Sequence, residues 1–98
     1  MKFYLDDIRN PVSDGWQIIR SAEKCIELLG LYGHFVTEIS FDHDLGTELS
    51  GYDVALWIEE QCYFGNMRCP KWNVHSANPV GRKNIETAMK NAEKYSRR

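Results

Sequence analysis

The chain has 98 residues, of which 12 are Lys or Arg and 14 are Asp or Glu, and 43% of its residues are hydrophobic. This length fits a single domain over residues 1–98, and the apolar fraction supports a core, which excludes disorder as the main state. The formal net charge of −2 argues against stable nucleic-acid binding, because that binding needs a basic face that neutralises phosphates. A small phosphorylated ligand held by a few local cations is compatible with this charge.

The sequence also bears on compartment and redox state. No apolar run approaches the roughly 18 residues that a membrane span needs, and the N-terminal sequence MKFYLDD is too acidic and too short for a signal peptide. Three cysteines, Cys25, Cys62 and Cys69, form an odd number without a CxxC pair, which predicts reduced thiols rather than a disulfide framework. We therefore expect a cytoplasmic protein without membrane contact. Nothing in the sequence indicates an oligomeric state.

In chain order, short apolar runs alternate with helical patterns. Strands are predicted at residues 2–5, 16–19, 35–41 and 71–74, and helices at residues 21–32, from the capping-box sequence Ser50–Asp53 through Cys62, and from Asn78–Pro79 through Ala92. This alternation is typical of an α/β layered domain around a mostly parallel sheet. Residues 7–15 are too few for the crossover helix of about a dozen residues that usually joins parallel strands. The link between the first two strands is therefore the weakest part of this topology.

Three of the four predicted strands end in polar clusters. In an open parallel sheet the carboxyl ends of the strands line one edge, and ligands bind in the crevice there. The sequence therefore predicts one rim that carries acids, histidines and the start of a helix. The clusters are Asp6, Asp7 and Arg9 after the first strand, Asp42, His43 and Asp44 after the third, and His75, Ser76 and Asn78 after the fourth.

The acids of this rim are hard oxygen ligands of the kind that Mg²⁺ or Mn²⁺ accepts. A single acid at a strand end is more often a turn former or a helix cap. Two acid clusters in one small domain favour a cation, because unpaired carboxylates repel one another. We expect Asp6, Asp7, Asp42 and Asp44 to be the metal ligands. A metal-free site, in which the acids only orient the histidines, stays open.

His43 and His75 each have polar neighbours in the sequence, whereas a buried structural histidine more often has apolar ones. An imidazole that titrates near neutrality can move protons at a scissile phosphate. We predict that the two histidines divide the roles of catalytic base and acid. In the alternative, one is catalytic and the other is only hydrogen-bonded.

The sequence Asn78–Pro79–Val80–Gly81 predicts a helix start with Asn as the cap. Free backbone N–H groups and the positive end of the helix dipole make such a start an anion site. Arg9 is a further candidate for phosphate binding, because its guanidinium offers bidentate donors. The predicted phosphate-binding residues are Arg9, Ser76, Asn78, Gly81 and Arg82.

Taken together, the motifs resemble the cyclic-phosphate processing receiver-like domain family, and the resemblance covers nearly the whole chain. The motifs that carry it are Leu5–Arg9, Gly15–Ser21, Phe41–Gly46, Gly51–Asp53 and His75–Gly81. The resemblance implies a small receiver-like (flavodoxin-like) three-layer α/β domain with a mostly parallel sheet of about four strands. It also implies the handling of cyclic phosphates in RNA repair or nucleotide signalling, with ADP-ribose cyclic phosphate as one suggested substrate. The site residues that it implies are Asp6, Asp7, Arg9, Asp42, His43, Asp44, His75, Ser76 and Asn78.

The leading hypothesis is a phosphoesterase that opens a cyclic phosphate on a nucleotide or ribose, with a divalent cation as a possible cofactor. One alternative is a non-catalytic binder that sequesters a phosphorylated nucleotide. A second is a receiver domain that accepts a phosphoryl group on Asp42 or Asp44. Against the second alternative, no lysine follows a fifth strand to complete a receiver triad, and His43 and His75 have no role in phospho-acceptance.

Overall fold

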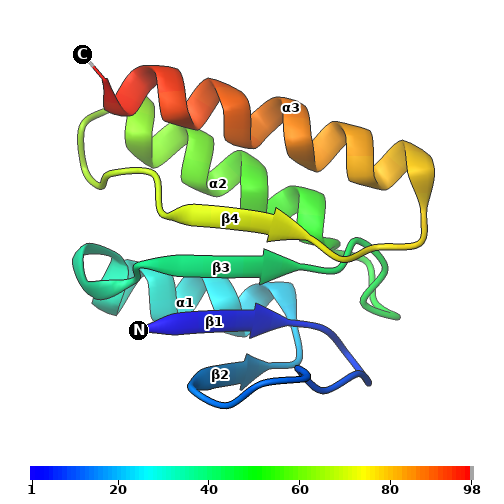
Figure 1. The fold of residues 1–98 in the computed structure, drawn as a ribbon. Helices are drawn as coiled ribbons and strands as arrows, with labels where there is room; N and C mark the ends of the chain where they lie inside the picture. The colour runs from blue at the N-terminus through cyan, green and yellow to red at the C-terminus, as the bar shows by residue number, and fades with distance from the viewer. Residues whose placement is uncertain (98) are drawn as a thin grey trace.

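The computed structural model describes residues 1–97, which form a four-stranded, all-parallel sheet with the strand order β2-β1-β3-β4 and three α-helices (Figure 1). The predicted α/β class and the parallel sheet are therefore confirmed. The elements are β1 (Lys2–Leu5), β2 (Trp16–Ile19), α1 (Ala22–Tyr32), the short 3₁₀ helix η1 (Gly33–Phe35), β3 (Glu38–Phe41), α2 (Gly51–Tyr63), β4 (Lys71–Val74) and α3 (Pro79–Ser96).

The three helix starts follow the predicted caps. The side chain of Ser21 accepts a hydrogen bond from the backbone of α1. Ser50 and Asp53 form a capping box at the start of α2, and Asn78 caps α3 with proline in the first turn. These caps satisfy backbone donors that the first turn of a helix leaves without partners.

One predicted strand is shorter than expected. The prediction of a strand over residues 35–41 is wrong at its beginning, because β3 starts only at Glu38. Residues 33–35 form η1 instead, and the backbone N–H of Val36 donates to the carbonyl of Gly33. Phe35 is exposed, so the apolar pattern that suggested a longer strand does not correspond to a buried strand face.

The helices cover one face of the sheet. Figure 1 shows α1 and α2 behind the sheet and α3 beside α2 along the β4 edge. Side chains that point to the helices, such as Phe3 and Ile39, are fully buried, whereas Tyr4 is partly exposed and Ile18 is 45% exposed on the opposite face. Among residues 1–97 no helix covers that opposite face. The domain therefore has one layer of helices and one layer of strands, instead of the three layers that the sequence resemblance implied.

The connection between β1 and β2 explains this difference. Residues 6–15 join two parallel neighbouring strands without a helix, and that short segment cannot supply a covering helix. The steps from β2 to β3 and from β3 to β4 run in the same direction across the sheet, and right-handed crossovers then place α1 and α2 on the same face.

No helix among residues 1–97 is long and apolar enough to span a membrane.

A close approach of backbones places the start of α2 against the end of β3. The N–H of Gly51 donates to the carbonyl of His43 at 2.9 Å, and a Cβ on Gly51 would overlap the carbonyl oxygen of Asp42. Only glycine fits here, so α2 begins directly beside the segment that carries Asp42.

Gly51→Ala should therefore lower the free energy of unfolding by about 1–3 kcal/mol, the usual cost of overpacking. Gly30→Ala is the matched control, because a Cβ at that helical position meets nothing within 4 Å and should raise stability by about 0.5–1 kcal/mol. Urea denaturation of both variants measures these changes. Equal stability of the Gly51→Ala variant and the wild type would contradict the close approach.

Candidate functional site

The backbone ladder continues one residue beyond the strands and places three side chains in neighbouring positions on one rim. The N–H of Asp42 donates to the carbonyl of Leu5 at 2.8 Å, and the N–H of His75 donates to the carbonyl of Phe41 at 2.9 Å. Asp6, Asp42 and His75 each directly follow a strand, and those strands are neighbours in the sheet. The predicted convergence of strand ends on one edge is thus present in the structure.

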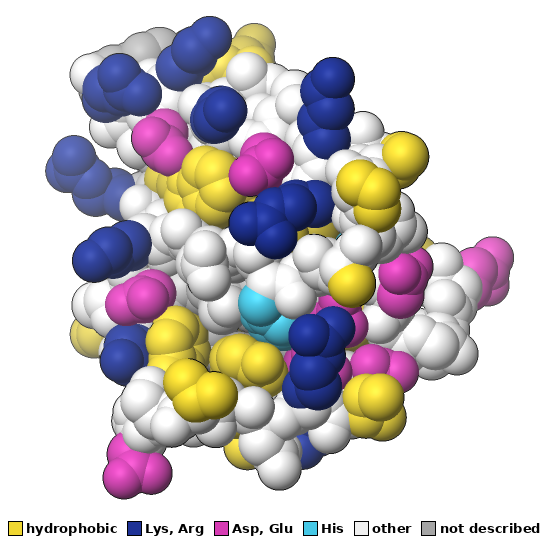
Figure 2. All heavy atoms as spheres, turned by 45° about the vertical axis from the view of Figure 1, so that its right-hand side comes forward, with side chains coloured by type: hydrophobic (Ala, Val, Ile, Leu, Met, Phe, Trp, Pro, Cys, Tyr) yellow, Lys and Arg dark blue, Asp and Glu magenta, His cyan; other side chains and the backbone are white. Residues whose placement is uncertain are grey.

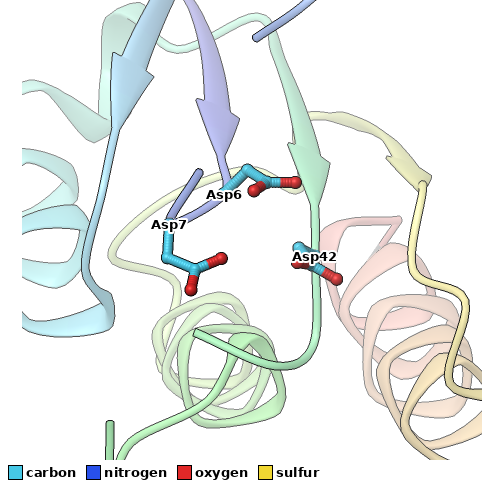
Figure 3. Close-up of side chains that lie close together, drawn as sticks. All are labelled: Asp6, Asp7 and Asp42. Carbon is cyan, nitrogen blue, oxygen red and sulfur yellow. The ribbon is translucent and has the colours of Figure 1, made fainter. Parts of the chain in front are cut away.

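Three carboxylates meet on this rim. One oxygen each from Asp6, Asp7 and Asp42 lies within 4.8 Å of the others, and Figure 3 shows the carboxylates facing a common space between the ends of β1 and β3. Asp6 and Asp42 are buried. Asp44, which was expected to join them, is not part of this group.

Asp6 is fully buried and receives four hydrogen-bonding or ionic contacts from three residues. Its Oδ1 accepts from the backbone N–H groups of Ile8 at 3.0 Å and Arg9 at 2.7 Å. Its Oδ2 lies 3.0 Å from Nε2 of His75 and 3.3 Å from Nε of Arg9. Burial is the largest single influence and opposes ionisation, but the N–H donors of Arg9 and Ile8 together with His75 outweigh it and lower the pKa of Asp6.

Arg9 is the cation that the structure itself supplies to the carboxylates. Besides its contact with Asp6, its Nη2 lies 3.9 Å from Oδ1 of Asp42, and its Nη1 donates to the carbonyl of His75 at 3.5 Å. The side chain of Arg9 is 51% exposed, so it can leave these carboxylates without disturbing the core.

The donor set fits a hard divalent cation such as Mg²⁺ or Mn²⁺, because all of its atoms are carboxylate oxygens. Three hydrogen bonds and the ion pair with Arg9 surround the two oxygens of Asp6. A cation that approaches Asp6 therefore competes with the Arg9 guanidinium for this carboxylate. Arg9 can move away most easily, because its side chain is 51% exposed.

Arg20, which the sequence analysis did not select, holds the loop that carries Arg9. Its Nη1 donates to the carbonyls of Arg9 at 2.7 Å and Asp6 at 3.2 Å, and its Nη2 donates to Oδ1 of Asn10 at 2.7 Å. The only signal in the sequence was the position of Arg20 within the motif Gly15–Ser21. Arg20 thus shapes the connection from β1 to β2 that replaces a crossover helix.

His75 is held at both ring nitrogens. Its Nε2 faces Asp6, and its Nδ1 lies 2.7 Å from the hydroxyl of Ser40, a buried residue of β3. An ionised Asp6 only accepts hydrogen bonds, so a neutral His75 ring donates from Nε2 and accepts at Nδ1. The ring also stacks on Tyr4, with centroids 4.4 Å apart. Ser40 and Tyr4 were missed, although Ser40 stood out as a polar residue inside an apolar strand.

Figure 2 shows this rim together with the uncovered face of the sheet. A histidine side chain lies near the centre of the view, between charged side chains and a group of hydrophobic ones. Some of the polar side chains of this rim thus reach the surface, whereas Asp6 and Asp42 are buried.

His43 belongs to a second group of polar side chains. Its Nδ1 lies 2.9 Å from Oδ1 of Asp44, whose Oδ2 accepts from Asn78 at 3.3 Å. These two hydrogen bonds lower the pKa of Asp44. The His43 ring packs against Gly81, where a Cβ would overlap it. Within residues 1–97 the Nε2 atom of His43 has no hydrogen-bond partner.

The start of α3 differs from the expected anion site. The N–H groups of Val80 and Gly81 donate to Oδ1 of Asn78 at 3.1 Å each, and the N–H of Arg82 donates to the carbonyl of Asn78 at 2.9 Å. Pro79 has no N–H. The prediction of free N–H groups in this turn is therefore wrong, because the cap side chain already uses them.

The other two predicted phosphate ligands also have protein partners. The hydroxyl of Ser76 is buried and accepts from the N–H of Asn78 at 3.1 Å. Arg82 donates to the carbonyl of Ser76 at 3.4 Å and lies 3.9 Å from Glu86. The Arg82 side chain is 47% exposed, so of these two residues it is the one that a ligand can reach.

Comparison with known proteins identifies the family. The family model described as the cyclic-phosphate processing Receiver domain matches residues 1–91. The chain belongs to this family, which confirms the resemblance seen in the sequence and associates the chain with cyclic-phosphate processing. Searches among curated proteins and among solved structures found no match.

Replacing Arg9 tests whether it competes with a cation for the carboxylates. Arg9→Gln should tighten Mn²⁺ binding by up to roughly tenfold, because it removes two half-exposed ion pairs with the carboxylates, each of which contributes about 0.2–1 kcal/mol. Isothermal titration calorimetry of the protein with Mn²⁺ alone gives the affinity. Arg68→Gln changes the net charge equally but lies before β4, at the other end of the strands. Equal tightening in both variants would show that only net charge matters.

The lowered pKa of Asp6 predicts how stability depends on pH. A carboxyl with a lower pKa in the folded state stabilises that state above its unfolded pKa of about 4, and this stabilisation is lost as pH falls through the folded pKa. Chemical denaturation at a series of pH values that decrease from near neutral into the acid range should show a shallower decline for Asp6→Asn than for the wild type. The exposed Asp14→Asn should keep the wild-type slope. An unchanged slope in Asp6→Asn would contradict the stabilising role of the ionised Asp6.

Proposed function

We propose that this protein is a metal-assisted phosphoesterase that opens a cyclic phosphate on a nucleotide or ribose. The observation that carries the proposal is the group of three carboxylates, Asp6, Asp7 and Asp42, within 4.8 Å of one another beside the half-exposed Arg9. Family membership supports the substrate class. ADP-ribose cyclic phosphate and 2′,3′-cyclic nucleotides are the first substrates to test.

The three carboxylates would hold a divalent cation, which when bound supplies positive charge that polarises the phosphate. Arg9 has a second task in this proposal. Once displaced from Asp6 and Asp42, its guanidinium can bind two phosphate oxygens in the bidentate geometry that arginine offers. Binding of the cation and binding of the phosphate would therefore support each other.

Hydrolysis of a cyclic phosphodiester adds one water, breaks one P–O bond and delivers a proton to the leaving oxygen. His43 is suited to this proton transfer, because Asp44 engages its Nδ1 while its Nε2 has no partner within residues 1–97. Neutral His43 would take a proton from water, and its imidazolium would return one to the leaving oxygen. His75, with both ring nitrogens engaged, would act as a positioning residue for Asp6.

The activity test uses a panel of cyclic phosphates with Mg²⁺, Mn²⁺ or EDTA, and mass spectrometry detects a product that has gained one water. His43→Ala should lower turnover by about 10²–10⁴ if His43 carries the proton. His34→Ala is the matched control, because His34 is exposed in η1 at the other end of the strands. Wild-type turnover in His43→Ala would remove His43 from the mechanism. Recovery of intact ligand with no turnover would replace the esterase by a sequestering binder.

A further inference from the structure

A groove runs between α2 and α3 on the solvent side of the helix layer. It has a volume of about 620 Å³. Three large apolar side chains in its wall are exposed, Leu56 to 38%, Tyr63 to 52% and Phe64 to 64%. The other residues of the wall are Glu59, Glu60 and Tyr95. Because soluble domains seldom expose a contiguous apolar patch that binds nothing, this groove is a candidate interface.

The groove side of α2 is distinct from the side that packs into the core. Leu56 and Tyr63 are seven positions apart, so they lie on one side of the helix. The ring of Tyr63 packs at a steep angle against the rings of Phe64 and Tyr95, with centroids 5.2 Å apart in each pair. The buried residues of α2 are different ones, namely Gly51, Val54, Ala55, Ile58 and Cys62. The chain therefore assembles a partly exposed aromatic cluster in addition to its core.

The two helices that form the groove carry opposite charges. The helix α2 has three acids and no basic residue, whereas α3 has four basic residues and two acids. Glu60 lies in the wall of the groove on α2, and Lys90 and Lys94 are exposed on α3. One side of the molecule thus presents an acidic stripe and a basic stripe next to each other.

Two contacts between the helices show how they are aligned. The side-chain amide of Asn91 donates to Glu59 at 2.8 Å, and the ring of Tyr95 packs against that of Tyr63. Both pairs are 32 positions apart in the sequence. The helices α2 and α3 therefore run parallel and in step, side by side as Figure 1 shows. Each residue of α2 is level with the residue of α3 that lies 32 positions later.

We propose that this protein forms a two-fold symmetric dimer in which the groove between α2 and α3 packs against the same groove of a second copy. A two-fold axis parallel to the helices lays α2 of each copy on α3 of the other copy at the same height. Glu60 then lies between Lys90 and Lys94 of the opposite helix, about 3 Å along the helix axis from each, because the rise is about 1.5 Å per residue. The apolar side chains of the two grooves meet in the centre of the interface.

The charges favour a second copy as the occupant of the groove. A different protein would have to carry a basic stripe and an acidic stripe at the spacing of α2 and α3. A second copy supplies both stripes by symmetry, since an isologous interface uses the same surface on each partner.

The proposed dimer leaves the carboxylate rim open in both copies. The helix α2 begins at the rim, where Gly51 donates to the carbonyl of His43, whereas the groove extends along α2 from Leu56 to Phe64 at its other end. The uncovered face of the sheet lies on the other side of the domain from the helices (Figure 1). The inference therefore stands independently of the proposed esterase activity.

Sedimentation equilibrium of the full-length protein from about 1 to 500 µM, the range in which a weak dimer dissociates, tests the proposal. The wild type should reach the mass of two chains. Phe64→Ser should raise the dissociation constant at least about tenfold, because an aromatic side chain is lost from the interface twice per dimer. Phe35→Ser is the matched control, because Phe35 is 67% exposed in η1, outside the groove, and should leave the dissociation constant unchanged. A mass of one chain throughout, or an equal dissociation constant for Phe64→Ser and the wild type, would overturn the proposal.

Reversal of charge tests the pairing of α2 with α3. Glu60→Lys and Lys94→Glu should each raise the dissociation constant roughly fivefold, because each leaves like charges opposite one another twice per dimer. The two substitutions together should return it close to the wild-type value. Glu23→Lys changes the net charge as Glu60→Lys does, but it lies on the exposed side of α1 and should have no effect. A double variant that dimerises no better than the single ones would contradict this arrangement of the two copies.

Discussion

The buried carboxylate of Asp6 is the constraint on which the rest of the site depends. An ionised group removed from water costs several kcal/mol unless it is paired and hydrogen-bonded. The partners of Asp6 come from the loop after β1 and from the end of β4. To satisfy this one charge, the loop must fold back over the rim, and His75 must lie beside β1. The geometry of the rim is thus set before any ligand arrives.

The same requirement explains why Arg9 lies across the carboxylates. Three acids in close proximity repel one another, and Arg9 relieves that repulsion within the folded chain. Arg20 in turn holds the Arg9 carbonyl. The arginine side chain is half exposed, whereas Asp6 and Asp42 are buried. Asp6 and Asp42 are therefore held in place, whereas the Arg9 guanidinium that neutralises them can move. Such a site can exchange the guanidinium for a bound ligand.

The short connection between β1 and β2 gives the domain its open face. Because no helix of residues 1–97 covers this side of the sheet, Tyr4 and His75 stack at its surface. Ser40 lies beneath them and fixes the hydrogen-bond direction of the His75 ring. The sheet is all-parallel although no helix joins β1 to β2, and the rim is therefore accessible from a second side.

The sequence by itself determined the local elements. Helix caps such as Ser21 and Asn78, the apolar stripes and the acids after each strand depend on residues only a few positions apart, and these patterns predicted most of the fold. The tertiary structure decided which of these groups meet. Strand register brings His75 to Asp6 and Ser40, which are 69 and 35 positions away, and chain packing brings Asn78 to Asp44, which is 34 positions away. Contacts between distant residues depend on how the strands align and how the helices pack, and no local pattern records that.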